Sequence, residues 1–306
     1  MPGISAGLNL ANLDDITQAE IDAYLTSRWY GRGPLYDMYA TSLMLDYAPD
    51  FMKMHRWLAD QSRLLPPRTP DPSLVGVVPG PNDTILVATI PQLFSYMMYG
   101  WETGIRNEFR VLRRLGLSRA EIMEIVLFGR LFTGMRGLGH TYHAIGDVLP
   151  DYRDGEVTPA WPHGWAPDSA AFKCGLDLST EDFTAQDRTN LTGWYERTIG
   201  YVPRWVRFAM RYDPRVLKAQ RALWELAIKK LPKQVAPYLM LRDAQVAADR
   251  EAMREAALLA HAWGITPAWI VNSITYTTMY FGGTRGFGFA DEAIGDLLAE
   301  WTPDWP

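Results

Sequence analysis

The chain has 306 residues, of which 48% are hydrophobic and 21% are charged, and its formal net charge is −5. This composition is typical of a globular chain that can bury roughly 75% of its unfolded surface. The negative charge argues against a nucleic-acid partner, because phosphate binding needs a basic face. The sequence lacks any 18-residue uncharged apolar stretch and any signal-like start, so we expect neither a membrane span nor secretion. The single cysteine, Cys174, cannot form an intramolecular disulfide, which favours a cytoplasmic location.

Helical periodicity dominates the chain. Apolar residues recur at spacings of three and four in residues 18–28, 35–64, 90–115, 119–132 and 204–231. This spacing predicts amphipathic helices, and strand signals are weak throughout. The Pro- and Gly-rich residues 65–82 predict a loop. The expected fold class is therefore all-α.

An internal duplication is visible in the sequence. Residues 134–149 read Gly-Met-Arg-Gly-Leu-Gly-His-Thr-Tyr-His-Ala-Ile-Gly-Asp-Val-Leu, and residues 283–298 read Gly-Thr-Arg-Gly-Phe-Gly-Phe-Ala-Asp-Glu-Ala-Ile-Gly-Asp-Leu-Leu. Upstream, residues 115–122 correspond to residues 263–270, each with a Gly that ends one helix and a Ser or Thr that begins the next. Further upstream, the matching residues are Tyr47, Pro49, Lys53, Arg56 and Leu58 with Tyr212, Pro214, Lys218, Arg221 and Leu223.

The duplication predicts the domain organisation. We expect an N-terminal arm over residues 1–31, a first helical unit over 32–150 and a second, degenerate unit over 199–306, packed as a pseudo-twofold dimer within one chain. Residues 151–198 form either an aromatic-rich lid or a solvated connector, since a segment of this length without periodicity is often functional.

Both copies resemble a known superfamily. The stretch from Leu115 to Gly134, and its second copy from Gly264 to Gly283, is similar to the signature of the carboxymuconolactone decarboxylase and alkylhydroperoxidase-D superfamily. In the peroxidase branch, a Cys-x-x-Cys-x-x-x-His motif lies on the preceding helix. The matching positions here are Glu102, Ile105 and Phe109 in the first copy and Arg250, Met253 and Ala257 in the second. Disulfide cycling needs a low-pKa thiol and a resolving partner, so we do not expect peroxidase activity.

The decarboxylase branch of that superfamily works without metal or organic cofactor. The resemblance therefore implies a non-redox lyase, decarboxylase or isomerase that acts on a small aromatic-derived or lactone-like acid, needs no cofactor and forms a homo-oligomer. This implication comes from analogy between folds, which host many functions.

Three residues are the catalytic candidates. His140 and His143 occur only in the first copy, and a spacing of three places them on one face of a helix. Histidine titrates near neutrality and suits a general acid or base, although two surface histidines are an equal alternative. Glu102 replaces a reactive cysteine in an aromatic helix, where desolvation would raise its pKa. Alternatively, Glu102 pairs with Arg106 four residues later.

The candidates for substrate binding lie on the same two helices and on the second unit. Arg136 is a possible anion holder, and Glu108 is either a site residue or simply solvated. Trp269, Tyr276 and Tyr280 recur at spacings of seven and four, as either core residues or the apolar wall of a pocket. The full set is Tyr142, Arg136, Trp101, Glu108, Trp269, Tyr276 and Tyr280.

Two other functions stay open. His140, His143, Asp147 and a carboxylate of the Glu102 helix would form a mixed nitrogen and oxygen site for a divalent metal. The chain would alternatively be an inactive ligand-binding or scaffold member of the superfamily.

Overall fold

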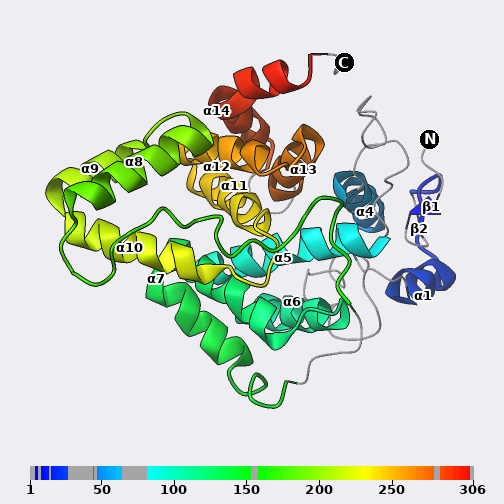
Figure 1. Cartoon of the computed structure of the whole chain (residues 1–306). Coiled ribbons are helices and arrows are strands. Elements are labelled where there is room, and N and C mark those ends of the chain that lie inside the picture. Colours follow the sequence, from blue (N-terminus) through cyan, green and yellow to red (C-terminus); the bar gives the residue numbers. More distant parts are fainter. Residues whose placement is uncertain are drawn as a thin grey trace. The chain divides into compact units, whose positions relative to one another are not determined.

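A computed structural model describes residues 4–5, 8–13, 15–26, 44, 47–63, 81–152, 158–278 and 283–303 (Figure 1). The chain divides into two compact units, Met1–Leu64 and Leu65–Pro306, and each is considered by itself. The predicted loop at 65–80, most of the predicted helix before residue 47 and Tyr280 lie outside the described residues.

In its described residues, the first unit combines a short β-ribbon with two helices. Strands β1 (Ile4–Ser5) and β2 (Leu8–Asn9) pair antiparallel, and the helices are α1 (Gln18–Thr26) and α4 (Pro49–Arg63). Lys53 of α4 is fully buried. Its Nζ lies 2.8 Å from the Glu20 carboxylate and donates to the carbonyl oxygens of Asn12 and Asp15. A buried ion pair with several hydrogen bonds thus ties α4 to α1.

The second unit is helical throughout its described part. Its helices are α5 (Pro81–Tyr99), α6 (Glu102–Arg114), α7 (Arg119–Ile145), α8 (Ala185–Ile199), α9 (Arg204–Tyr212), α10 (Pro214–Ala227), α11 (Val235–Ala247), α12 (Arg250–Ala262), α13 (Pro267–Thr277) and α14 (Arg285–Trp301). The predicted all-α class is confirmed for these residues. Within the described ranges, none of the helices combines the length and apolar character that crossing a bilayer requires.

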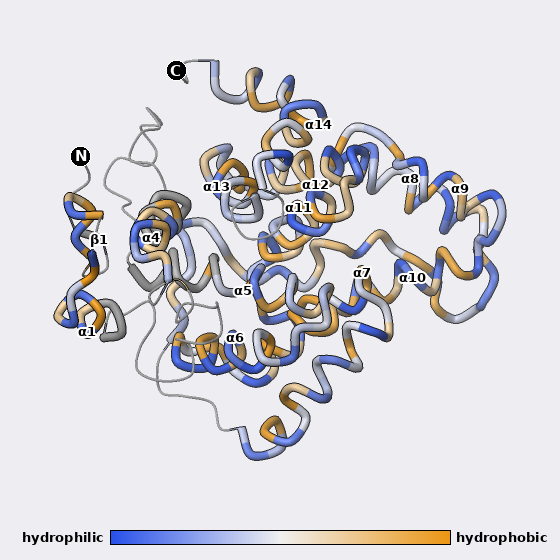
Figure 2. The backbone as a smooth tube through the Cα atoms, turned by 180° about the vertical axis from the view of Figure 1, so that it is seen from behind, coloured by the Kyte–Doolittle hydropathy of each residue, from blue (hydrophilic) through white to orange (hydrophobic). Residues whose placement is uncertain are grey.

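Helix packing follows two similar sets of neighbours. In one set, α5, α6 and α7 contact one another; in the other, α11 contacts α12 and α13, and α14 contacts α12 and α13. Helix α5 also packs against α11, and α10 packs against α7, as Figure 1 shows. Hydrophilic and hydrophobic residues alternate along α6 in Figure 2, and its buried side includes Ile105, Phe109 and Leu112.

Several predicted helix bounds are wrong. The helix predicted over 90–115 is broken at Gly100, whose φ of 71° is a left-handed conformation that interrupts the helix. The helix predicted over 204–231 is broken at Asp213, whose side chain caps α10 by accepting a hydrogen bond from the Val216 N–H. Apolar residues occur on both sides of each break, so periodicity alone does not reveal the breaks. Helix α7 continues past residue 132 to Ile145, with a kink at Gly134.

The segment predicted as a lid or connector contributes buried side chains to the second unit's core. Helix α8 lies within it and begins with a capping box between Thr184 and Asp187. The described residues 158–184, which precede α8, form no helix, but the side chains of Trp165 and Phe172 are buried. A solvated connector therefore does not describe residues 158–198.

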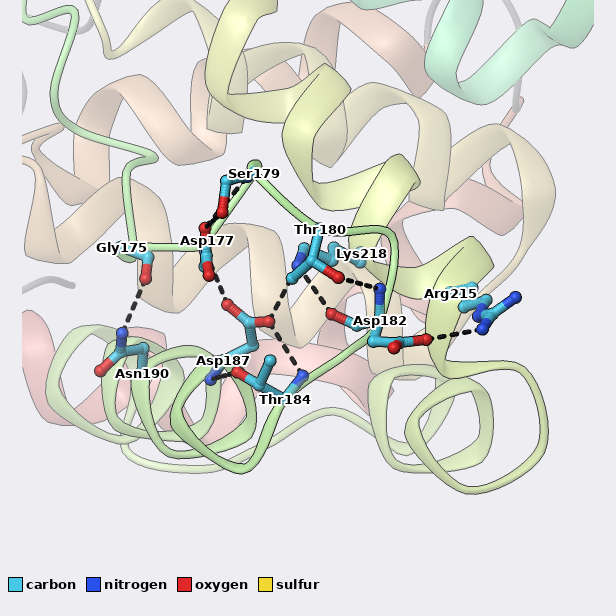
Figure 3. Close-up of polar contacts among 10 residues, drawn as sticks. All are labelled: Gly175, Asp177, Ser179, Thr180, Asp182, Thr184, Asp187, Asn190, Arg215 and Lys218. Atoms are coloured by element: carbon cyan, nitrogen blue, oxygen red, sulfur yellow. Dashed lines mark hydrogen bonds and ion pairs between the residues drawn. The ribbon is translucent and has the colours of Figure 1, made fainter.

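Lys218 of α10 lies in a buried polar cluster much like that of Lys53 (Figure 3). Its Nζ is 3.0 Å from the Asp187 carboxylate and donates to the Asp182 carbonyl oxygen at 2.8 Å. Asp187 also accepts hydrogen bonds from the backbone N–H groups of Asp177 and Thr184. The cluster anchors the loop before α8 to α10.

Candidate functional site

Two of the predicted catalytic residues meet. His140 lies in the C-terminal half of α7, and Glu102 is the first residue of α6. The distance between His140 Nδ1 and Glu102 Oε1 is 3.0 Å, and their side chains are 31% and 46% exposed. The Glu102 carboxylate is therefore partly solvated rather than desolvated.

The turn before α6 fixes the position of the imidazole. Gly100 has a φ of 71°, and a Cβ atom added to it would lie 2.6 Å from His140 Nε2. Only glycine therefore allows both this backbone conformation and the close approach of the ring. The His140 ring is held between Gly100 and the Glu102 carboxylate.

This contact sets the tautomer of the neutral imidazole. A carboxylate accepts only, so His140 Nδ1 carries the hydrogen and donates it to Glu102. The lone pair then lies on Nε2, which is the arrangement of a general base oriented by an acid. When His140 is protonated, the same contact becomes an ion pair.

Two other candidate residues lie near this pair in the chain. Trp101 is 37% exposed, and its ring packs edge-on against Tyr96 with 4.8 Å between centroids. Arg136 is exposed and precedes His140 by one helical turn, which places both side chains on one face of α7. An exposed cation and an aromatic surface thus accompany the His140–Glu102 pair.

His143 and Tyr142 point to solvent instead. Tyr142 is 71% exposed, and its ring contacts the exposed His143 ring with 6.0 Å between centroids. The structure shows no hydrogen bond or ion pair that joins His143 to the pair of Glu102 and His140. A spacing of three therefore did not bring both histidines to one partner.

The other expectations for α6 are resolved by burial and charge. Glu108 is 3% exposed and accepts a hydrogen bond from the Asn107 side chain, so the solvated alternative is wrong. Arg106 pairs with Asp147 at 3.3 Å, so the alternative that it pairs with Glu102 is also wrong. Among the described residues, no group of three or more His, Cys, Asp or Glu side chains is placed to hold a metal ion.

The aromatic stripe of α13 lies in the core. Trp269 is 4% exposed, and its ring contacts Trp165 and Tyr238. Tyr276 is 2% exposed and lies under the Arg242 guanidinium, 5.2 Å from carbon to centroid. Tyr280 lies outside the described residues. Packing alone accounts for the two described rings.

Sequence reasoning missed a buried polar group beside these rings. Arg242 of α11 is fully buried, and its Nε donates to the Ser95 hydroxyl of α5. The Tyr238 hydroxyl donates to the Asn272 side chain at 3.3 Å, and burial raises the pKa of Tyr238. A charged residue directly after the apolar run of residues 235–241 was the available signal, because a buried arginine needs partners.

No protein-family model, curated protein or solved structure matches this chain.

Proposed function

We propose that this protein is a cofactor-independent enzyme in which His140 and Glu102 move a proton at carbon. The reaction is a decarboxylation, another lyase step or an isomerisation of a small aromatic-derived or lactone-like acid. The observation that carries the proposal is the 3.0 Å contact between His140 and Glu102, two residues that the sequence analysis selected on separate grounds.

The arrangement suits proton transfer next to a carbonyl. In decarboxylation, the bond from carbon to the carboxylate breaks and carbon dioxide leaves. The electron pair of the broken bond moves into the conjugated carbonyl. Protonated His140 then donates its Nε2 proton to carbon, while Glu102 stabilises the imidazolium beforehand. In isomerisation, neutral His140 first removes a proton from carbon and then returns it at another carbon. General acid–base catalysis of this kind contributes about 10²- to 10⁴-fold in rate.

Two neighbouring residues support the choice of substrate. The exposed Arg136 guanidinium, one turn before His140, matches the geometry of a carboxylate. The partly exposed side chain of Trp101, next to Glu102, suits a flat or unsaturated ring. In the proposed complex, Arg136 holds the carboxylate that is retained and Trp101 packs against the ring.

We further propose that two fused helical repeats of the decarboxylase-like superfamily build the fold, related by a pseudo-twofold axis. Support comes from contacts that recur at matching positions. The Arg106–Asp147 ion pair corresponds to Arg254–Asp296, whose two hydrogen bonds are both 2.8 Å long. The left-handed Gly116 likewise corresponds to Gly264. The correspondence also includes Lys53 and Lys218. Lys53 forms an ion pair with a residue of α1, and Lys218 forms one with a residue of α8.

In this proposal, the second repeat has lost the catalytic pair. Phe289 stands at the position of His140, and Arg250 stands at that of Glu102. Arg250 instead pairs with Glu292, which stands at the position of His143. An exposed ion pair in the second copy thus replaces the acid–base pair of the first.

The proposal extends to the setting of the enzyme. The Cys174 thiol donates to Glu225 at 3.3 Å, and burial raises its pKa to about 11, which suits a reduced thiol in the cytoplasm. A small-molecule substrate and a homo-oligomer complete the proposed assignment.

A substrate screen with matched variants tests the function. Purified protein is assayed against aromatic-degradation acids and lactones, with and without chelator, after elemental analysis. We expect chelator-insensitive turnover that falls at least 100-fold in His140→Ala and Glu102→Gln, while His143→Ala stays within a few fold of the parent. Stoichiometric metal with chelator-sensitive turnover would favour the metalloenzyme alternative, and ligand binding without turnover would favour the scaffold alternative.

A further inference from the structure

A buried arginine in the second unit has more hydrogen-bond donors than the surrounding protein accepts. Arg221 of α10 is 1% exposed, and its Nη2 donates to the carbonyl oxygen of Phe172. Its Nε and Nη1 make no hydrogen bond to any described residue. An arginine stays charged in proteins, so these buried N–H groups cannot escape the desolvation cost by losing a proton.

Aromatic rings surround the guanidinium. Its carbon lies 4.0 Å from the centroid of the Trp194 ring, 5.5 Å from Phe172 and 5.6 Å from Tyr195. Phe172 and Trp194 stack on each other with 6.1 Å between centroids. We call the group formed by Phe172, Trp194, Tyr195, Arg221, Trp224 and Glu255 the Arg221 cluster. Cation–π contacts orient the charge, but they leave its N–H groups without acceptors.

Two further polar atoms of the cluster are buried without a partner among the described residues. They are the Tyr195 hydroxyl on α8 and the Trp224 indole N–H on α10, one helical turn after Arg221. Burial raises the pKa of Tyr195, and the neighbouring Arg221 guanidinium opposes this effect. Since the arginine and indole groups only donate and the phenol also can, the cluster is short of acceptors.

One carboxylate belongs to the cluster. Glu255 of α12 is 4% exposed and accepts a hydrogen bond from the Trp205 indole at 3.0 Å. Burial raises the pKa of Glu255 to about 7, although the Trp205 hydrogen bond and the Arg221 charge oppose this. Glu225 is already engaged, because it accepts from the backbone and thiol of Cys174. Near neutrality, the carboxylates therefore do not fully satisfy Arg221.

We infer that the Arg221 cluster is a second ligand site, separate from the His140–Glu102 pair, that takes a small aromatic carboxylate. The carboxylate supplies the acceptors that the guanidinium, phenol and indole lack, and its aromatic ring matches the aromatic side chains around Arg221. Ordered water would also satisfy single donors, but water adds neither negative charge nor stacking.

Benzoate is the probe for this inference. Binding to the full chain is measured by calorimetry and by the rise in Tm, with acetate and chloride as controls for charge alone. We expect saturable benzoate binding that weakens about 10-fold in Tyr195→Phe and in Trp224→Phe. Each substitution removes one donor; the first keeps the same ring, and the second replaces indole by the smaller phenyl ring. The control Tyr238→Phe removes a buried hydroxyl elsewhere in the unit and should leave the affinity unchanged.

The same series separates this inference from the proposed enzyme function. His140→Ala should bind benzoate as the parent does, whether or not turnover is ever detected. Absence of saturable binding would overturn the inference, and so would equal affinities in the parent, Tyr195→Phe and Trp224→Phe. Loss of binding in His140→Ala would assign benzoate to the first site and overturn it as well.

Discussion

Replacing Lys218 by methionine removes the cation from a buried ion pair and keeps a chain of similar length. The two partners are almost inaccessible, since the side chains of Lys218 and Asp187 are 4% and 1% exposed. Breaking a buried pair by removing one partner costs about 3–5 kcal/mol, because the other charge stays buried. Asp187 would keep the backbone hydrogen bonds from Asp177 and Thr184, so we expect a loss near the lower end, about 3 kcal/mol.

The Lys218→Met variant should also differ from the parent in how its stability depends on pH in acid. Burial opposes ionisation of Asp187, but the N–H groups of Asp177 and Thr184 and the Lys218 ammonium outweigh it and lower its pKa to about 2. A lowered pKa stabilises the fold above the ordinary value near 4, and this stability is lost as pH falls toward 2. Without Lys218 the pKa of Asp187 rises, so the acid-dependent part of the stability should shrink.

The assay is urea unfolding at several pH values, with hydrogen exchange of residues 177–199 to localise the effect. Arg215→Ala is the matched control, because the neighbouring Arg215–Asp182 pair is 66% exposed on both sides and is worth about 0–1 kcal/mol (Figure 3). Lys53→Met should have the corresponding effect on the first unit, where it should accelerate hydrogen exchange. Equal losses in Lys218→Met and Arg215→Ala would refute the reasoning.

Three further predictions concern the site and the Arg221 cluster. Gly100→Ala should lower the free energy of unfolding by about 1–2 kcal/mol, because of the positive φ of Gly100, and should lower turnover at least 10-fold by displacing His140. Gly139 has open space around it, so Gly139→Ala should change neither quantity. Circular dichroism melts and the turnover assay check both expectations. Glu102→Gln should lower kcat more than KM, because the amide no longer stabilises the imidazolium, and equal changes in both constants would contradict this role. The raised pKa of Glu255 means that this residue should destabilise the fold as pH rises from its ordinary pKa of 4.5 through about 7. In urea unfolding, the free energy of unfolding of Glu255→Gln should therefore exceed that of the parent by about 3 kcal/mol at pH 8 and equal it at pH 4.

The sequence predicted the presence of helices more accurately than the residues at which they begin and end. Apolar spacing identified α6, α7 and α10, because each buries one face. It missed the breaks at Gly100 and Asp213, since apolar residues continue on both sides of each break. The strand pair at the N-terminus was also missed, as four residues carry too little pattern.

The candidate site was predicted in part for a similar reason. Comparison of the two repeats identified His140, and the superfamily motif identified Glu102, so their contact required only that α6 and α7 be neighbours. The outward direction of His143 depends on the course of α7 after its kink at Gly134, which the spacing of residues does not encode. The Arg221 cluster combines α8, α10, α12 and the irregular segment with Phe172, and only the tertiary structure brings these together.

Deuterium incorporation at carbon tests the central claim most directly. The protein is incubated in D₂O with candidate aromatic-derived acids and lactones, and NMR follows exchange or deuterated product at the carbon next to the carbonyl. The account predicts incorporation that is insensitive to chelator and falls at least 100-fold in His140→Ala. Substrate conversion without deuterium at carbon, or equal incorporation in the parent and His140→Ala, would contradict it.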